Sequence, residues 1–184
     1  MKRIDLNDEM MEAITAYHNL IAEVNELSGN LSSVHADHIV CKAGCYSCCM
    51  DFGVLPVEFF AILADREGSI SAAVKATGEE CLHLKDGLCA IYDSRPLICR
   101  THGLPLLYND GDDWQLSVCD LNFTGDKQPD FSEDNTFPQD TFNSRLFMIN
   151  QEFMDAMDEA LFHDDTLLDL SLLGSGSYSV KGGK

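Results

Sequence analysis

A chain of 184 residues with 45% hydrophobic and 23% charged residues is typical of one globular domain with a core of its own. Its formal net charge of −19 makes nucleic acid and anionic membrane surfaces poor partners, because an acidic surface repels phosphate groups. The charge is uneven: residues 40–104 sum to −2, whereas residues 1–39 and 105–184 sum to −5 and −12. We interpret the acidic flanks as solvated surface that keeps the protein soluble.

The N-terminal residues Met-Lys-Arg-Ile-Asp-Leu carry basic residues without the apolar run of a signal peptide. No stretch approaches the ~18 apolar residues of a membrane helix. We therefore expect a cytoplasmic protein, and in that compartment stable disulfides are uncommon. This setting favours thiolate ligands over disulfide bridges.

Apolar residues recur at steps of three, four or seven from Leu6 to Leu31, which predicts an N-terminal helix over residues 5–28. Asp5 is its expected cap, and Ser28-Gly29-Asn30 its expected end or interruption. After Pro56, a natural first helical residue, we expect a helix over residues 57–66. A further helix is expected over residues 70–77.

Two hairpins and a short helix are expected in the middle of the chain. Asp86-Gly87 predicts a hairpin within residues 81–92. Residues 93–96, with Pro96 near the first turn, predict the start of a short helix. A second hairpin pattern joins residues 104–108 to 114–119, and its acidic turn lacks the ligand spacing of an EF-hand.

The C-terminal part is expected to be a loop over residues 120–135 followed by a long helix over residues 137–162. Thr136 and Gln139 are the expected capping box of this helix, with Pro138 in its first turn. An apolar stripe from Phe142 to Leu161 marks its inner face. The Gly/Ser-rich residues 174–184 are typical of a linker-like tail that we expect to be mobile, which leaves 1–173 as a single domain.

The expected fold class is mainly α with short β-hairpins. In this interpretation the N- and C-terminal helices pack around a loop-rich cysteine metal core that spans residues 40–120.

All eight cysteines of the chain lie within that core, and four of them fall within nine residues. A cluster of this density is typical of a metal site or of a disulfide framework, and we favour the metal site. The candidate ligands are Cys41, Cys45, Cys48, Cys49, Cys81, Cys89, Cys99 and Cys119.

The spacing within the first four cysteines supports metal ligation. Cys45 and Cys48 are separated by two residues, which lets both sulfurs reach one ion, and Cys41 can join them through a turn at Gly44. Cys48 and Cys49 are adjacent, and in an extended backbone their side chains point to opposite sides. Either the pair serves two metals, or one member binds metal and the other packs or bridges elsewhere.

Eight thiolates fit two four-cysteine sites, or one iron–sulfur cluster plus one zinc. Because such sites carry about −2 each by formal charge, Arg95 and Arg100 around Cys99 are candidate donors to sulfur. Ordinary salt bridging is the other interpretation of these arginines.

Histidine is the other candidate zinc ligand. His83 and His102 lie inside the cysteine segment, and either could replace a cysteine and leave that thiol free. His38 is the best candidate among the N-terminal histidines, because it lies three residues before Cys41.

The pattern Cys-x3-Cys-x2-Cys-Cys, followed by Cys…Asp-Gly-x-Cys-x-Ile-Tyr-x2-Arg-Pro-x2-Cys-Arg, resembles the YkgJ-type cysteine-cluster family. This family is described as a zinc- or iron-chelating domain with a CxxCxxCC signature. The resemblance covers about residues 40–120 and implies that all eight cysteines occupy family positions. A similar domain occurs in flagellin lysine methylases, which implies that such a cluster can serve an enzyme. The first spacing here is three residues instead of two.

Three functions remain open. The first is a cytosolic metal-binding protein with zinc as its first-choice metal, in which the metal also supports folding, as structural zinc does in peptides by roughly 10–16 kcal/mol. The second is an iron–sulfur or iron protein with redox or methylase-like activity, although no S-adenosylmethionine loop, nucleophile–base pair or Walker motif is recognisable. The third is a disulfide-stapled interaction protein. The sequence leaves open whether the protein is an enzyme.

Overall fold

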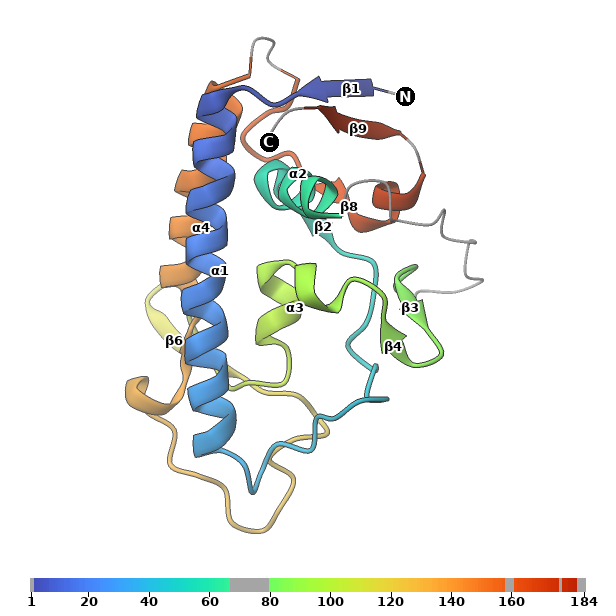
Figure 1. The fold of residues 1–184 in the computed structure, drawn as a ribbon. Helices are drawn as coiled ribbons and strands as arrows, with labels where there is room; N and C mark the ends of the chain where they lie inside the picture. Colours follow the sequence, from blue (N-terminus) through green and yellow to red (C-terminus); the bar gives the residue numbers. More distant parts are fainter. Residues whose placement is uncertain (1, 67–79, 158–160, 176, 182–184) are drawn as a thin grey trace.

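The computed structural model describes residues 2–66, 80–157, 161–175 and 177–181. In these residues two long helices lie side by side, α1 (Asp8–Val34) and α4 (Gln139–Asp155), as Figure 1 shows. They run in opposite directions, because Asn7 before α1 donates its side-chain amide to Ala156 O after α4, at 2.7 Å. The shorter helices α2 (Pro56–Asp65) and α3 (Leu97–Thr101) pack on one side of this pair.

The strands form small, separate sheets. Strand β1 (Lys2–Asp5) pairs in parallel with β9 (Tyr178–Lys181), and β2 (Gly53–Val54) pairs antiparallel with β8 (Leu168–Asp169). Short 3-10 turns lie at Tyr92–Ser94, Glu133–Asn135 and Leu170–Gly174.

Both predicted hairpins are confirmed. The first consists of β3 (Leu84–Lys85) and β4 (Leu88–Cys89), and the second of β5 (Leu106–Asp110) and β6 (Asp113–Ser117). Strand β7 (Phe137–Pro138) adds to β5 in parallel.

The fold class is mixed α/β, which corrects the expectation of a mainly α protein. The hairpins were predicted, but β1, β2, β7, β8 and β9 pair residues far apart in the chain, and such pairing leaves little local signal. Within residues 174–184, which we expect to be a mobile tail, Tyr178–Lys181 forms strand β9. The helix expected over residues 70–77 lies outside the described residues. None of the described helices is long and apolar enough to cross a membrane.

Helix α1 differs from its prediction at both ends. Its cap is Asn7, not Asp5: the Asn7 Oδ1 accepts a hydrogen bond from Met10 N at 2.8 Å, while Asp5 belongs to β1. The helix also continues through Gly29 to Val34, because Leu31 is buried against the core. Tertiary burial here outweighs the low helix propensity of glycine.

Helix α4 also differs from its prediction. The capping box is made by Ser132 and Asn135, one turn earlier, and it caps the 3-10 turn Glu133–Asn135. Thr136 instead donates its hydroxyl to Ser132 O at 2.7 Å, and Pro138 precedes the helix without a side-chain cap. The helix ends at Asp155, before the expected residue 162.

The core is built mainly from α1, α2 and α4, and aromatic rings fill its centre. Phe60 of α2 stacks on Phe153 of α4 with ring centroids 5.8 Å apart, and both side chains are fully buried. Asn150, also fully buried, accepts a hydrogen bond from Val57 N at 3.1 Å and so satisfies an N–H group in the first turn of α2. These contacts fix α2 against the long helices.

A buried carboxylate joins this core to α3. Glu58 of α2 is 4% exposed, and its Oε1 accepts a hydrogen bond from Leu97 N, the first residue of α3, at 2.9 Å. Burial raises the pKa of Glu58 to about 7, against the opposing hydrogen bonds from the Leu97 and Leu55 backbone and the Tyr17 hydroxyl. Glu58 therefore holds the helix that carries Cys99.

We expect Glu58→Gln to remove a pH dependence of stability. Glu58 is ionised in the unfolded chain above pH 4.5 but stays protonated in the folded protein up to about pH 7. Wild-type stability should therefore fall by about 3 kcal/mol as the pH rises through this window, then level off. The glutamine of the variant keeps an acceptor for Leu97 N and does not titrate, so the variant's stability relative to wild type should rise over the same window.

The measurement is urea unfolding of both proteins between pH 4.5 and 8. Glu12→Gln, on the exposed face of α1, is the matched control and should show no such rise. Parallel stability curves for Glu58→Gln and wild type would contradict the assignment.

Candidate metal centre

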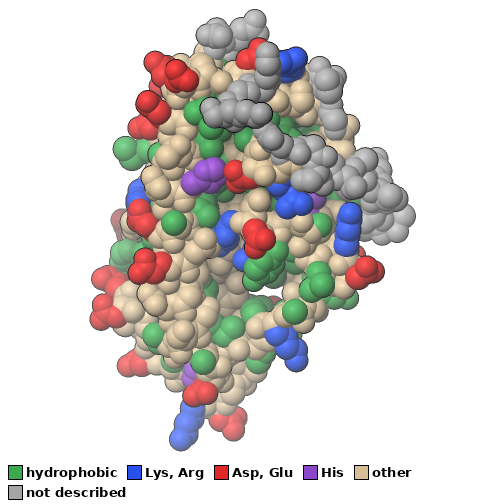
Figure 2. Space-filling view, viewed as in Figure 1, with side chains coloured by type: hydrophobic (Ala, Val, Ile, Leu, Met, Phe, Trp, Pro, Cys, Tyr) green, Lys and Arg blue, Asp and Glu red, His purple; other side chains and the backbone are tan. Residues whose placement is uncertain are grey.

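The cysteines surround one cavity of about 530 Å³ lined by the cysteine loop, the β3–β4 hairpin and Cys99 of α3. Seven of the eight line it; the eighth, Cys119, lies outside the lining. Arg95 and His102 also line the cavity. All eight cysteines lie in the described part of the chain as free thiols. Figure 2 shows the surface hollowed near the centre of this face, with basic side chains around the middle and acidic ones mainly along the α1 edge.

The first four cysteines lie on a loop that has no buried side chain from residue 40 to residue 53. Two backbone turns shape it: Cys45 N donates to Lys42 O at 2.9 Å, and Cys49 N donates to Tyr46 O at 2.8 Å. Gly44 takes φ +91° in the first turn, a conformation that favours glycine. Phe52, beyond the cysteines, packs against the apolar core, whereas the four cysteines are brought back toward one another by the turns.

The hairpin of β3 and β4 places Cys81 and Cys89 beside this loop. Cys81 N donates to Cys49 O at 3.1 Å, and Leu84, which pairs with Cys89 in the hairpin, donates its N–H to Cys81 O at 3.0 Å. Cys99 comes from α3, the short helix held by Glu58. Three separate segments therefore supply the thiols of this half of the cavity.

Cys41 is held by a residue that the sequence interpretation missed. Asn122, 2% exposed, donates its side-chain amide to Cys41 Sγ at 3.4 Å and to Gly103 O at 2.7 Å. Its Oδ1 accepts a hydrogen bond from Val40 N at 3.0 Å. One amide therefore joins the cysteine loop, the turn after α3 and the segment after Cys119. No sequence signal identified Asn122, because it is one of several polar residues in an irregular stretch.

Partial burial makes several of these thiols weak acids. It raises the pKa of Cys99 to about 12 and that of Cys49 to about 11, and neighbouring cysteine charges raise both further. Burial also raises the pKa of Cys48 and Cys81. These four thiols are therefore protonated at neutral pH, and a bound cation must displace their protons.

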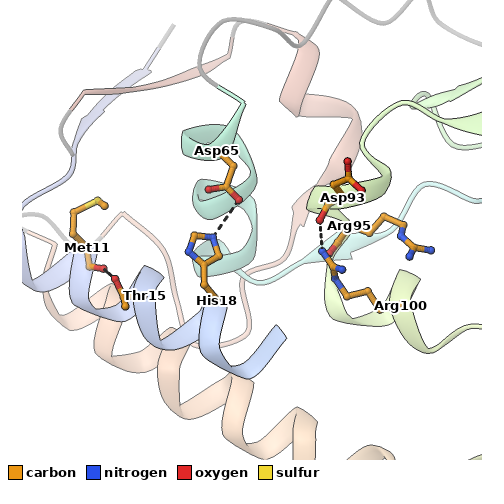
Figure 3. A network of polar contacts seen from close by, with 7 residues as sticks. All are labelled: Met11, Thr15, His18, Asp65, Asp93, Arg95 and Arg100. Atoms are coloured by element: carbon orange, nitrogen blue, oxygen red, sulfur yellow. Dashed lines mark hydrogen bonds and ion pairs between the residues drawn. The ribbon is translucent and has the colours of Figure 1, made fainter. Parts of the chain in front are cut away.

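The two candidate arginines have different roles. Arg100 donates to Arg95 O and Asp93 O, both at 2.6 Å (Figure 3). It also donates to Asn25 Oδ1 of α1 at 2.9 Å. Each of its three nitrogens thus has an oxygen partner, so Arg100 serves as a link from α3 to α1. Arg95 lies over the Tyr92 ring at 3.6 Å and donates to Cys99 O at 3.4 Å. Its charge lowers the pKa of Cys99, against the effect of burial, so Arg95 is the better candidate for balancing thiolate charge.

The three candidate histidines also differ in their surroundings. His83 is buried, and its Nε2 lies 2.9 Å from Leu170 O, which makes it an anchor of the hairpin. His38 stacks on Phe123 with ring centroids 5.8 Å apart. His102 lines the cavity, and among the described residues its buried Nε2 has no hydrogen-bond partner. His102 is therefore the histidine with a nitrogen still available beside the thiols.

The donor set suits a thiophilic cation, because several thiols, one available imidazole and one guanidinium share a single cavity. Among the described residues, no three His, Cys, Asp or Glu side chains converge as closely as the shell of one ion requires. Side-chain rotations of the cysteines would be needed to close such a shell.

Residues 40–120 match the family model described as "CxxCxxCC: Putative zinc- or iron-chelating domain". The match confirms the resemblance drawn from the cysteine spacing, and it includes all eight cysteines. Neither the curated proteins nor the solved structures contain a significant match to the chain.

Close packing at Cys41 leads to a prediction for Gly103. This glycine has φ +93°, and a Cβ added to it would lie 2.7 Å from Cys41 Sγ. Gly111 also has a positive φ, of +69°, but nothing lies within 4 Å of its added Cβ. We expect Gly103→Ala to destabilise the protein by about 1–3 kcal/mol more than Gly111→Ala, because only the former crowds a neighbour. Urea unfolding measures both, and equal losses would contradict the contact.

Proposed function

We propose, from the match of residues 40–120 to the CxxCxxCC zinc- or iron-chelating family, that the protein binds zinc through its cysteine thiolates in the cytoplasm. The observation that carries this proposal is the loop of residues 40–53, which contributes four thiols and buries no side chain. A segment without a core needs other cross-links to hold one conformation. Thiolate–metal bonds supply such cross-links.

The convergence of seven cysteines from the loop, the hairpin and α3 on one cavity supports thiolate ligation. A zinc ion held by four thiolates is redox-inert and supplies charge and cross-linking, not electron transfer. The chain's own residues then have defined tasks. The cysteines bind, Asn122 and Arg95 orient and balance the thiolates, and Glu58 and Arg100 fix α3.

The direct test is metal analysis of the full chain purified without oxygen. We expect bound zinc, no visible colour, and protection of the thiols from alkylation until a chelator is added. Chelation should lower the melting temperature, because metal binding and folding are coupled. Iron with acid-labile sulfide and visible absorption would instead support the iron–sulfur alternative. A chain without metal whose thiols alkylate freely would overturn the proposal.

Asn122→Asp tests the ordering of the cysteine loop. The aspartate keeps an acceptor for Val40 N but loses the N–H groups that Asn122 donates to Cys41 Sγ and Gly103 O. We expect zinc affinity to fall about 10–100-fold, the usual effect of losing a hydrogen bond to a metal ligand. Competition with a chromophoric chelator measures the affinity.

The matched control is Asn143→Asp, which adds the same charge on the exposed face of α4. It should leave zinc affinity unchanged. A similar loss in both variants would mean that added negative charge, not the hydrogen bond to Cys41, is responsible.

A further inference from the structure

We propose that the eight cysteines form two separate four-thiolate zinc sites, divided between the adjacent residues Cys48 and Cys49. Site A comprises Cys41, Cys45, Cys48 and Cys119, and site B comprises Cys49, Cys81, Cys89 and Cys99. This inference rests on the proposed zinc-binding function and adds which cysteines share an ion.

The contacts of Asn122 connect the two ends of site A. Its side chain holds Cys41 Sγ at 3.4 Å, and its backbone N–H donates to Cys119 O at 2.9 Å. Cys119 is therefore drawn to Cys41, although the two residues are far apart in sequence. The turn from Lys42 to Cys45 returns the next cysteine toward the same place.

Backbone pairing connects the members of site B. The hydrogen bond from Cys81 N to Cys49 O is extended by the bridge between Met50 and Glu80, so the second half of the loop runs beside the hairpin. The hairpin holds Cys89 opposite Leu84, whose N–H contacts Cys81 O. Cys99 reaches this group from α3, and Arg95 ties the Cys99 carbonyl to the turn before that helix.

Spacing and backbone contacts assign the two adjacent cysteines of the loop. Cys48 is separated from Cys45 by two residues, a spacing that lets both sulfurs reach one ion. Cys49 instead accepts the backbone hydrogen bond from Cys81 N, which places it beside the hairpin.

Because Cys48 and Cys49 are adjacent but belong to different sites, the backbone between them must direct their side chains to different ions. The turn at Cys48-Cys49, in which Cys49 N donates to Tyr46 O and Met50 N donates to Cys48 O at 3.2 Å, must send the two sulfurs to different ions. The alternative is one shared cluster, in which a thiolate bridges both metals. These two arrangements respond differently to paired substitutions.

The test compares double variants of equal size by zinc content after dialysis. Cys41→Ser with Cys119→Ser removes two ligands from site A, and Cys81→Ser with Cys89→Ser removes two from site B. Each should retain one zinc of the two expected in wild type. The crossed pair, Cys41→Ser with Cys81→Ser, removes one ligand from each site and should weaken the binding of both zinc ions. Loss of both ions in either same-site pair would overturn the division in favour of a shared cluster.

Cadmium-substituted wild-type protein gives a second test that does not depend on variants that fold. Two ¹¹³Cd resonances are expected, each correlated through bonds with the β-protons of four cysteines. Cys48 and Cys49 should correlate with different ions. A cysteine coupled to both ions, or one resonance that serves all ligands, would overturn the division. Wild-type protein that binds no zinc would instead refute the proposed function itself.

Discussion

The loop of residues 40–53 sets the main physical constraint on this protein, because it contains four thiols and no buried side chain. The paired helices α1 and α4 bury aromatic and aliphatic side chains with α2 and hold their own shape. The cysteine loops have turns, one hairpin and a few polar anchors instead. Hydrophobic burial stabilises the helices. The cysteine loops have little of it, so their conformation depends on what their thiols bind.

A small number of polar contacts connect these two parts. Glu58 receives the first N–H group of α3, Arg100 reaches Asn25 on α1, and the buried His83 contacts Leu170 O. Buried hydrogen bonds of this kind are costly to leave unpaired, so each fixes the position of its segment strongly. His83 is the one buried residue between residues 80 and 90, so its contact with Leu170 O is the main buried anchor of the hairpin that carries Cys81 and Cys89.

The sequence predicted the features that local patterns encode. The Asp86-Gly87 turn, the helix after Pro56 and the cysteine spacing each depend on neighbouring residues, and the structure and the family match agree with them. Features that depend on distant residues were missed. Asn122 matters because the fold brings it to Cys41, and β9 forms because β1 is available at the other end of the chain. The cap at Asn7 shows the same limit, since Asp5 is an equally good cap by type but is used in β1.

The division between Cys48 and Cys49 would also couple the two sites energetically. An ion in site A fixes the backbone on one side of the dipeptide, and the same ordering positions Cys49 for site B. Binding of the first ion then includes most of the entropy cost of ordering the loop. The second ion binds more favourably because the loop is already ordered. Charge works against this coupling, because each four-thiolate site carries about −2 by formal charge. Arg95 beside Cys99 offsets part of that repulsion, and residues 40–104, with a net charge of −2 in a chain of −19, add little negative charge of their own. Most of the remaining negative charge lies in the flanks, residues 1–39 and 105–184.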